Sequence, residues 1–171
     1  CDPQPSPDGF PQVMLAGARG AEVVALAAPL DALPKLLEEV LATGTKALVF
    51  DLASIKGPLV PILRRAASEG HKVTSLHPLF GPDVELLSGK RLLVGRCGHG
   101  GAVREARAFF EDTTLSLVEV EIEEHDALVG QVLGLSHAIN ILFAAALGRS
   151  GSPLARHLEA ASTTFLRQAG A

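Results

Sequence analysis

The stretch EVVALAAPLDALPKLLEEVLATG, residues 22–44, decides the fold class, because an apolar run of strand length leads directly into an amphipathic helix. Residues 22–28 form the predicted strand. Apolar residues then recur at helical spacing: Leu33, Leu36, Leu37, Val40 and Leu41. Asp31 is the predicted N-cap of this helix, and Gly44 is its predicted stop. A strand followed by a helix is the repeating unit of α/β folds.

The same alternation continues along the next eighty residues. Further strands are predicted for ALVFDL (47–52), VTSL (73–76), RLLVG (91–95) and LSLVEVEI (115–122), and further helices for residues 58–70 and 101–111. The strands are mostly continuous apolar runs and do not alternate with period two. This pattern predicts a mostly parallel sheet with helices on both faces.

The character of the chain changes at His125. Residues 125–148 predict one long, mostly apolar helix, and residues 152–168 predict another. Helices this apolar must pack against the sheet domain or against a second subunit. We therefore place a domain boundary at residue 124, which gives domains 1–124 and 125–171.

Composition excludes several classes of protein. The formal net charge is -4 and the pI is near 5.8, and no basic cluster is longer than Arg64-Arg65, so neither nucleic acid nor an anionic membrane is an expected partner. Two cysteines and no metal-ligand spacing predict neither a disulfide framework nor a metal site. The strongest apolar run, residues 138–147, is about half of the ~20 residues that span a bilayer. A cytoplasmic protein is expected.

Three polar segments follow predicted strands, and they are candidates for one ligand-binding crevice. They are APLD (28–31), DLASIKG (51–57) and HPLFGPD (77–83). In open α/β sheets, ligands bind outside the carboxyl ends of the strands.

The histidine of HPLFGPD is the most informative of these residues. Pro78 biases the backbone of His77 toward an extended conformation. An ordinary histidine pKa near ~6.5 would leave a neutral fraction able to accept a proton at pH 7. On the sequence alone, His77 is either a catalytic base or a polar loop residue.

Two further residues also leave two readings open. Ser54 is either a helix cap or a ligand contact, and His137 is either a core histidine or a site residue.

A nucleotide fingerprint is not evident within the sequence. GRCGHGGAV (95–103) lies between a strand and a helix, but it departs from G-x-G-x-x-G and is read as an ordinary turn. We expect the fingerprint upstream of Cys1. Asp2 would then end the second strand of the complete fold and bind the ribose of a nucleotide, with a solvated turn residue as the alternative.

Taken together, four segments resemble the prephenate dehydrogenase family in order and spacing. They are AAPLDALP, VFDLASIKGPL, SLHPLFGPD and EEHDALVGQVLGLSHAINILFAAAL. The HPLFGPD form is most similar to the bifunctional or fused bacterial type. The resemblance implies a partial Rossmann-like domain, without its first βα unit, followed by part of a helical dimerisation domain.

The resemblance also implies a reaction and roles for particular residues. The family oxidatively decarboxylates prephenate or arogenate in tyrosine biosynthesis, with NAD or NADP as the cofactor and usually as a homodimer. His77 matches the catalytic base, and Ser54 matches the serine that contacts substrate and cofactor. Substrate contacts are expected at His137, Lys56 and Gln131, and cofactor contacts at Asp2, Pro29, Leu30 and Ser54.

Two departures from the family pattern leave other functions open. The cofactor loop and the carboxylate-binding arginine of the family fall outside residues 1–171. A catalytically lapsed homologue that acts as a regulatory or dimerising module is one alternative. A sister dehydrogenase for an amino-substituted prephenate is another. The pair His125-Asp126 matches a recurrent feature at the start of the long helix and is expected to be structural.

Overall fold

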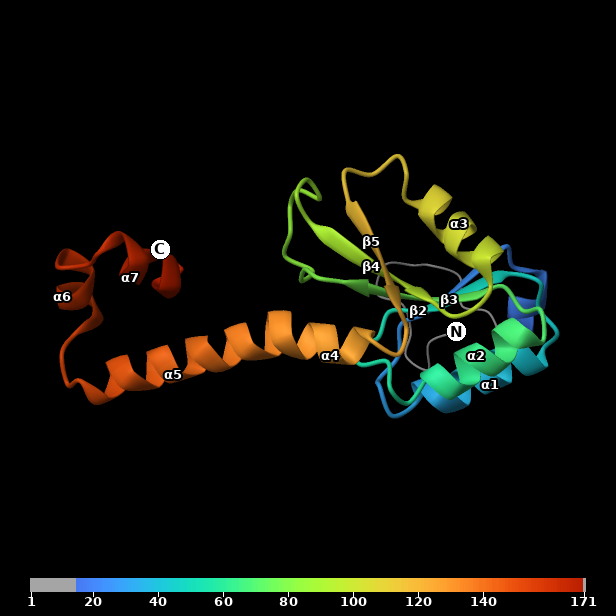
Figure 1. The fold of residues 1–171 in the computed structure, drawn as a ribbon, viewed down its shortest axis with the longest axis horizontal. Coiled ribbons are helices and arrows are strands. Elements are labelled where there is room, and N and C mark those ends of the chain that lie inside the picture. Colours follow the sequence, from blue (N-terminus) through green and yellow to red (C-terminus); the bar gives the residue numbers. More distant parts are fainter. Residues whose placement is uncertain (1–14, 171) are drawn as a thin grey trace. The chain divides into compact units, whose positions relative to one another are not determined.

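A five-stranded sheet forms the centre of the first part of the chain (Figure 1). The computed structural model describes residues 15–170. The strands are β1 (Val23–Leu26), β2 (Leu48–Asp51), β3 (Val73–Pro78), β4 (Arg91–Arg96) and β5 (Ser116–Glu121), and their order in the sheet follows the sequence. Strands β1, β2 and β3 are parallel, so their carboxyl ends lie along the same edge.

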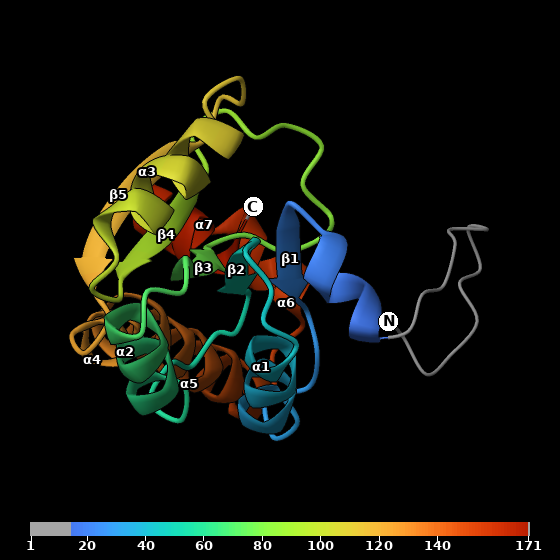
Figure 2. The ribbon, with the colours of Figure 1, turned by 90° about the vertical axis from the view of Figure 1, so that its right-hand side faces the viewer.

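Helices cover both faces of this sheet, as the alternation predicted (Figure 2). Helices α1 (Leu33–Ala42) and α2 (Val60–Ser68) pack over one face, and α3 (Gly100–Phe109) covers the other. Each face has its own apolar core, with Leu37 and Leu63 in one and Leu76 and Ala102 in the other. A short 3-10 helix, Leu15–Gly20, precedes β1.

One of the four strand pairings is antiparallel. Strand β4 is antiparallel to β3, with His77 opposite Leu93, and β5 is parallel to β4. The sheet is therefore mostly parallel. The connection between β3 and β4 holds no helix, and it returns the chain along the neighbouring strand. Strand β3 also extends beyond the predicted VTSL and includes His77 and Pro78, in agreement with the extended conformation that a following proline favours.

The predicted helix ends are correct at their glycines but wrong at one cap. Gly44 and Gly70 have φ of 72° and 85° just after α1 and α2, a conformation that favours glycine. The N-cap of α1 is Ala32, and no side chain caps it, so the prediction for Asp31 is wrong. Pro34 in the first turn supplies a fixed φ instead.

The second unit is helical and starts after Asp126. Contacts between Cα atoms divide the chain into Cys1–Asp126 and Ala127–Ala171, which compares with the boundary expected at residue 124. Helix α4 (His125–Val129), a π-helical turn (Gly130–Gly134) and α5 (Leu135–Arg149) make one continuous helix. The single helix predicted for residues 152–168 is instead two, α6 (Leu154–Glu159) and α7 (Thr163–Ala169). Ser162 breaks the helix there by accepting the hydrogen bond from Phe165 N.

The apolar part of the long helix extends beyond residues 138–147, the run that the sequence pattern indicated. Its 25 residues contain a window with a mean hydropathy of 1.6, and none of that window is buried. By length and composition alone, this helix could cross a membrane. The same properties are found in helices that pack against a partner protein.

Candidate active site

The carboxyl ends of β1, β2 and β3 bring the polar segments together. Leu26 pairs with Asp51, and Asp51 pairs with Ser75, two residues before His77. Beside the first two strand ends lies a pocket of about 350 Å³, lined by Ala28, Leu30, Leu33, Leu52, Ala53, Ser54 and Ile55. This is the edge at which open α/β sheets bind ligands.

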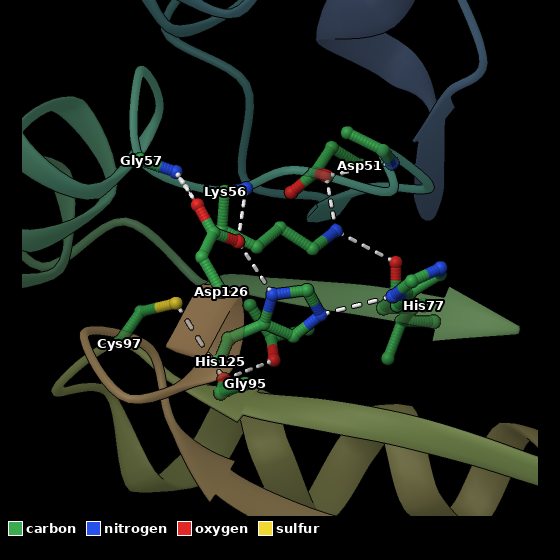
Figure 3. A network of polar contacts seen from close by, with 11 residues as sticks. Asp51, Lys56, Gly57, His77, Gly95, Cys97, His125 and Asp126 are labelled. Carbon is green, nitrogen blue, oxygen red and sulfur yellow. Dashed lines mark hydrogen bonds and ion pairs between the residues drawn. The ribbon is translucent and has the colours of Figure 1, made fainter. Parts of the chain in front are cut away.

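A buried ion pair joins β2 to β3 behind this edge. Lys56 Nζ donates to Asp51 Oδ1 at 2.6 Å and to the Leu76 carbonyl at 2.8 Å (Figure 3). The side chains of Lys56 and Asp51 are each 1% exposed. Burial lowers the pKa of the Lys56 amine, and the attraction of Asp51 opposes this effect. The pair holds the backbone next to His77 in place.

The carboxylate of Asp126 accepts hydrogen bonds from the backbone just before α2. Its Oδ1 accepts from Lys56 N and its Oδ2 from Gly57 N, both at 2.8 Å. These are free N–H groups where the chain turns into α2, and a carboxylate is favourable there. Among the described residues no hydrogen bond comes from the Ser54 hydroxyl, so Ser54 does not cap this helix, which was one of the two readings that the sequence left open. The hydroxyl stays exposed toward the pocket.

His77 lies at the end of a short chain of hydrogen bonds. Its Nδ1 is 3.0 Å from His125 Nε2, and His125 Nδ1 is 2.8 Å from Asp126 Oδ1. His77 Nε2 has no hydrogen-bond partner among the described residues, and it is not among their fully enclosed polar atoms that lack a partner, which are Asp51 Oδ2 and Ser75 Oγ. In this series of hydrogen bonds, His77 Nε2 is therefore the atom that can form a hydrogen bond with a ligand.

The surroundings keep both imidazoles neutral at pH 7. Burial, followed by repulsion from His125 and Lys56, lowers the pKa of His77 to about 4. Burial also lowers the pKa of His125, although its hydrogen bond to Asp126 opposes the shift. Burial alone would raise the pKa of Asp126, but the donors from Lys56, His125 and Gly57 lower it below its usual value. His77 is thus fully neutral at pH 7, where the sequence had predicted only a neutral fraction.

The structure separates the predicted site residues into three groups. Leu30 and Ser54 line the pocket, with Pro29 next to it in the chain, and His77 lies at the neighbouring strand end. His137 and Gln131 are exposed residues of the second unit and stay predictions. Asp2 lies outside the described residues.

The substrate contact expected of Lys56 stays a prediction. Its ammonium is buried, and two of its hydrogen bonds go to Asp51 and to the Leu76 carbonyl inside the protein.

Sequence reasoning missed two contributors. Asp51 was read as a strand-end polar residue and is half of the buried pair, while His125-Asp126 was read as structural and contacts His77. For His125-Asp126, the only sequence signal was a pair of adjacent polar side chains at the start of a predicted helix.

Fold and site together define a Rossmann-like α/β domain with a polar constellation at its ligand-binding edge. A family model described as "Prephenate dehydrogenase, nucleotide-binding domain" matches residues 9–94, half of the 171-residue chain. The chain belongs to the prephenate dehydrogenase family. No curated protein sequence is significantly similar to it.

Solved structures share the fold at low sequence identity. Prephenate dehydrogenase from Aquifex aeolicus, in complex with hydroxyphenyl propionate and NAD+, has a TM-score of 0.65 and 21% identity, over 92% of this chain and 60% of that chain. An imine reductase from Myxococcus stipitatus, in complex with NADP+, has a TM-score of 0.65 and 19% identity, over 90% of this chain and 54% of that one. The chain thus spans little more than half the length of these structures.

Removing one partner of the buried ion pair should lower the stability of the protein, and neutralising the other partner as well should restore part of it. Lys56→Met leaves the Asp51 carboxylate buried without its partner, so we expect the free energy of unfolding to fall by roughly 3–5 kcal/mol. Asp51→Asn in the same chain removes the uncompensated charge and should restore part of this loss. Urea unfolding of the single and double variants measures both effects. A single variant as stable as the wild type would contradict the role given to the pair.

The low pKa of His77 predicts a loss of stability in mild acid. The unfolded chain, with a pKa near ~6.5, binds more protons than the folded chain, whose His77 pKa is about 4. The contribution is complete above pH ~6.5 and decreases as the pH falls toward about 4, by ~3 kcal/mol in total. Urea unfolding across this range should show a smaller pH slope for His77→Gln than for the wild type, whereas His71→Gln, outside the network, should keep the wild-type slope. Equal slopes for all three proteins would refute the prediction.

Proposed function

We propose that the protein is an NAD(P)-dependent oxidoreductase of tyrosine biosynthesis that oxidatively decarboxylates prephenate or arogenate, with His77 as the general base. One observation carries the proposal. His77 is buried, neutral and held through Nδ1, while its Nε2, at the ligand-binding edge of the sheet, has no hydrogen-bond partner within residues 15–170. Membership of the prephenate dehydrogenase family supports the choice of reaction.

The pocket beside the strand ends fits one part of a nicotinamide cofactor. Its lining is apolar apart from polar backbone and the Ser54 hydroxyl, which suits a flat ring with one hydrogen-bonding edge. When bound, NAD(P)+ accepts a hydride from the substrate. Leu30 and Ser54 would hold the cofactor near His77, with Pro29 shaping the strand-end loop. The structures in complex with NAD+ and NADP+ share this fold, which supports the assignment.

His77 would take the proton of the substrate's ring hydroxyl. The O–H bond breaks, the proton moves to Nε2, and the electron pair that remains on oxygen favours a carbonyl as hydride and CO2 leave. Such general base catalysis typically contributes about 10²- to 10⁴-fold to the rate. Ser54, exposed beside the pocket, would orient the hydroxyl. With its pKa lowered to about 4, His77 is neutral around pH 7 and its Nε2 is available to accept a proton.

The remaining assignments concern the second unit. His137 and Gln131 would contact the substrate, and the apolar helix would form the interface of a homodimer in a cytoplasmic enzyme. The exposure of Ile141 (68%) and Leu142 (69%) in α5 supports the need for a partner surface.

The enzyme proposal is tested by incubating the full-length gene product with NAD+ or NADP+ and with prephenate, arogenate or an amino-substituted prephenate, while following NAD(P)H at neutral pH. His77→Asn keeps a polar group near Nδ1 and removes Nε2, so kcat should fall by about 10²- to 10⁴-fold while KM changes only a few-fold. His71→Gln serves as the matched control. A folded wild-type protein that forms no NAD(P)H with any pair would favour the lapsed homologue, and an unchanged kcat in His77→Asn would remove His77 as the base.

The interface proposal predicts a change of oligomeric state. Ile141→Glu with Leu142→Glu places two charges on the exposed apolar helix, so we expect the dimer to become a monomer in analytical ultracentrifugation. Thr164→Glu, at an exposed site of α7, should leave the dimer intact. If the wild type is monomeric, or if it sediments with lipid vesicles and the double variant does not, the dimer proposal is wrong and a membrane role for this helix gains support.

A further inference from the structure

The pair His125-Asp126 is connected by hydrogen bonds to His77, the proposed base. Two hydrogen bonds lie in series, from Asp126 Oδ1 to His125 Nδ1 at 2.8 Å and from His125 Nε2 to His77 Nδ1 at 3.0 Å (Figure 3). His125 is 1% exposed and His77 is 5% exposed. All three residues belong to the first unit, although they come from β3 and from the start of α4.

Only one arrangement of protons satisfies every contact in this series. An ionised carboxylate accepts hydrogen bonds and donates none, so the proton of His125 lies on Nδ1. His125 Nε2 is then an acceptor, and the proton of His77 must lie on Nδ1. His77 Nε2 is left with its lone pair. The reverse arrangement would place two acceptors, His125 Nδ1 and Asp126 Oδ1, against each other at 2.8 Å.

Asp126 is itself fixed from the other side. The backbone N–H groups of Lys56 and Gly57 donate to its two oxygens, and a Cβ at Gly57 would lie 3.3 Å from Oδ2. Because Lys56 also binds the Leu76 carbonyl, the loop that contains Ser54 and the strand end at His77 are tied to the same carboxylate. The charged groups that face the imidazoles are Lys56, Asp51 and Asp126.

We propose that His125 and Asp126 are positioning residues, which hold His77 as the tautomer with a proton on Nδ1 and an unprotonated Nε2. The inference rests on the proposed function for its catalytic consequence, but the tautomer is a property of the protein without any substrate. When Nε2 takes a proton, Nδ1–H still donates to His125, and the negative charge of Asp126 lies behind His125 to stabilise the imidazolium. The proton on Nε2 can then pass to solvent, which returns His77 to the same neutral tautomer.

The tautomer can be measured directly in the full-length protein. Nitrogen-15 labelled histidine and long-range proton–nitrogen NMR at pH 7 report which ring nitrogen carries hydrogen. We expect His77 in the wild type to be protonated at Nδ1 and bare at Nε2. A wild-type His77 that is protonated at Nε2 overturns the proposal without the need for any variant.

Two variants of His125 separate positioning from packing. His125→Phe keeps a ring and removes the acceptor, so His77 should become a mixture of tautomers. His125→Gln places a carbonyl oxygen near the position of Nε2 and should restore the wild-type tautomer. An unchanged His77 tautomer in His125→Phe would overturn the proposal, as would a mixture in both variants.

Kinetics then test the consequence for catalysis. We expect kcat to fall by about 10²-fold in His125→Phe, with KM within a few-fold of the wild type, and to recover in large part in His125→Gln. His71→Gln controls for the loss of a histidine. If the NMR result holds while none of the proteins turns over prephenate or arogenate, the proposed function fails and the positioning role of His125-Asp126 stands. If turnover is normal in His125→Phe, the positioning role in catalysis is wrong.

Discussion

The carboxylate of Asp126 is the constraint on which the site depends. It accepts three hydrogen bonds, two from backbone N–H groups where the chain enters α2 and one from His125. A carboxylate is well suited to this position because it has two oxygens and no donor, and because the start of a helix attracts negative charge. Asp126 lies at the start of α4. Through these three hydrogen bonds it orients the loop at Lys56 and Gly57 and the imidazole of His125, which contacts His77.

Burial of charge gives the site its other property. Lys56 and Asp51 are enclosed behind the strand ends, where the low dielectric strengthens their attraction but removes their hydration. Burial, followed by repulsion from His125 and from the Lys56 ammonium, lowers the pKa of His77 to about 4, although Asp51 opposes the shift. The same arrangement that organises the strand ends therefore keeps the imidazole neutral. A neutral imidazole with one free nitrogen is what proton abstraction from a hydroxyl requires.

Much of the fold could be predicted from local patterns. Apolar runs of strand length, helical spacing of leucines and glycines after helices identified the elements, because each of these signals acts over a few neighbouring residues. The errors arose where distant residues decide. The antiparallel β4, the uncapped start of α1 and the break at Ser162 depend on packing or on a single hydrogen bond, and none has a distinct local pattern.

The sequence by itself determined the α/β class, the polar strand ends and the extended histidine before Pro78, since these follow from periodicity and from proline sterics. It also placed Ser54 and His77 at neighbouring strand ends. Only the tertiary structure decided that Lys56 is buried against Asp51 and that His125-Asp126 reaches His77, 48 residues away in the chain. A residue type and its spacing state which hydrogen bonds a side chain is able to make. Which partner it meets, and how far from water, is set by the packing of strands and helices that are distant in sequence.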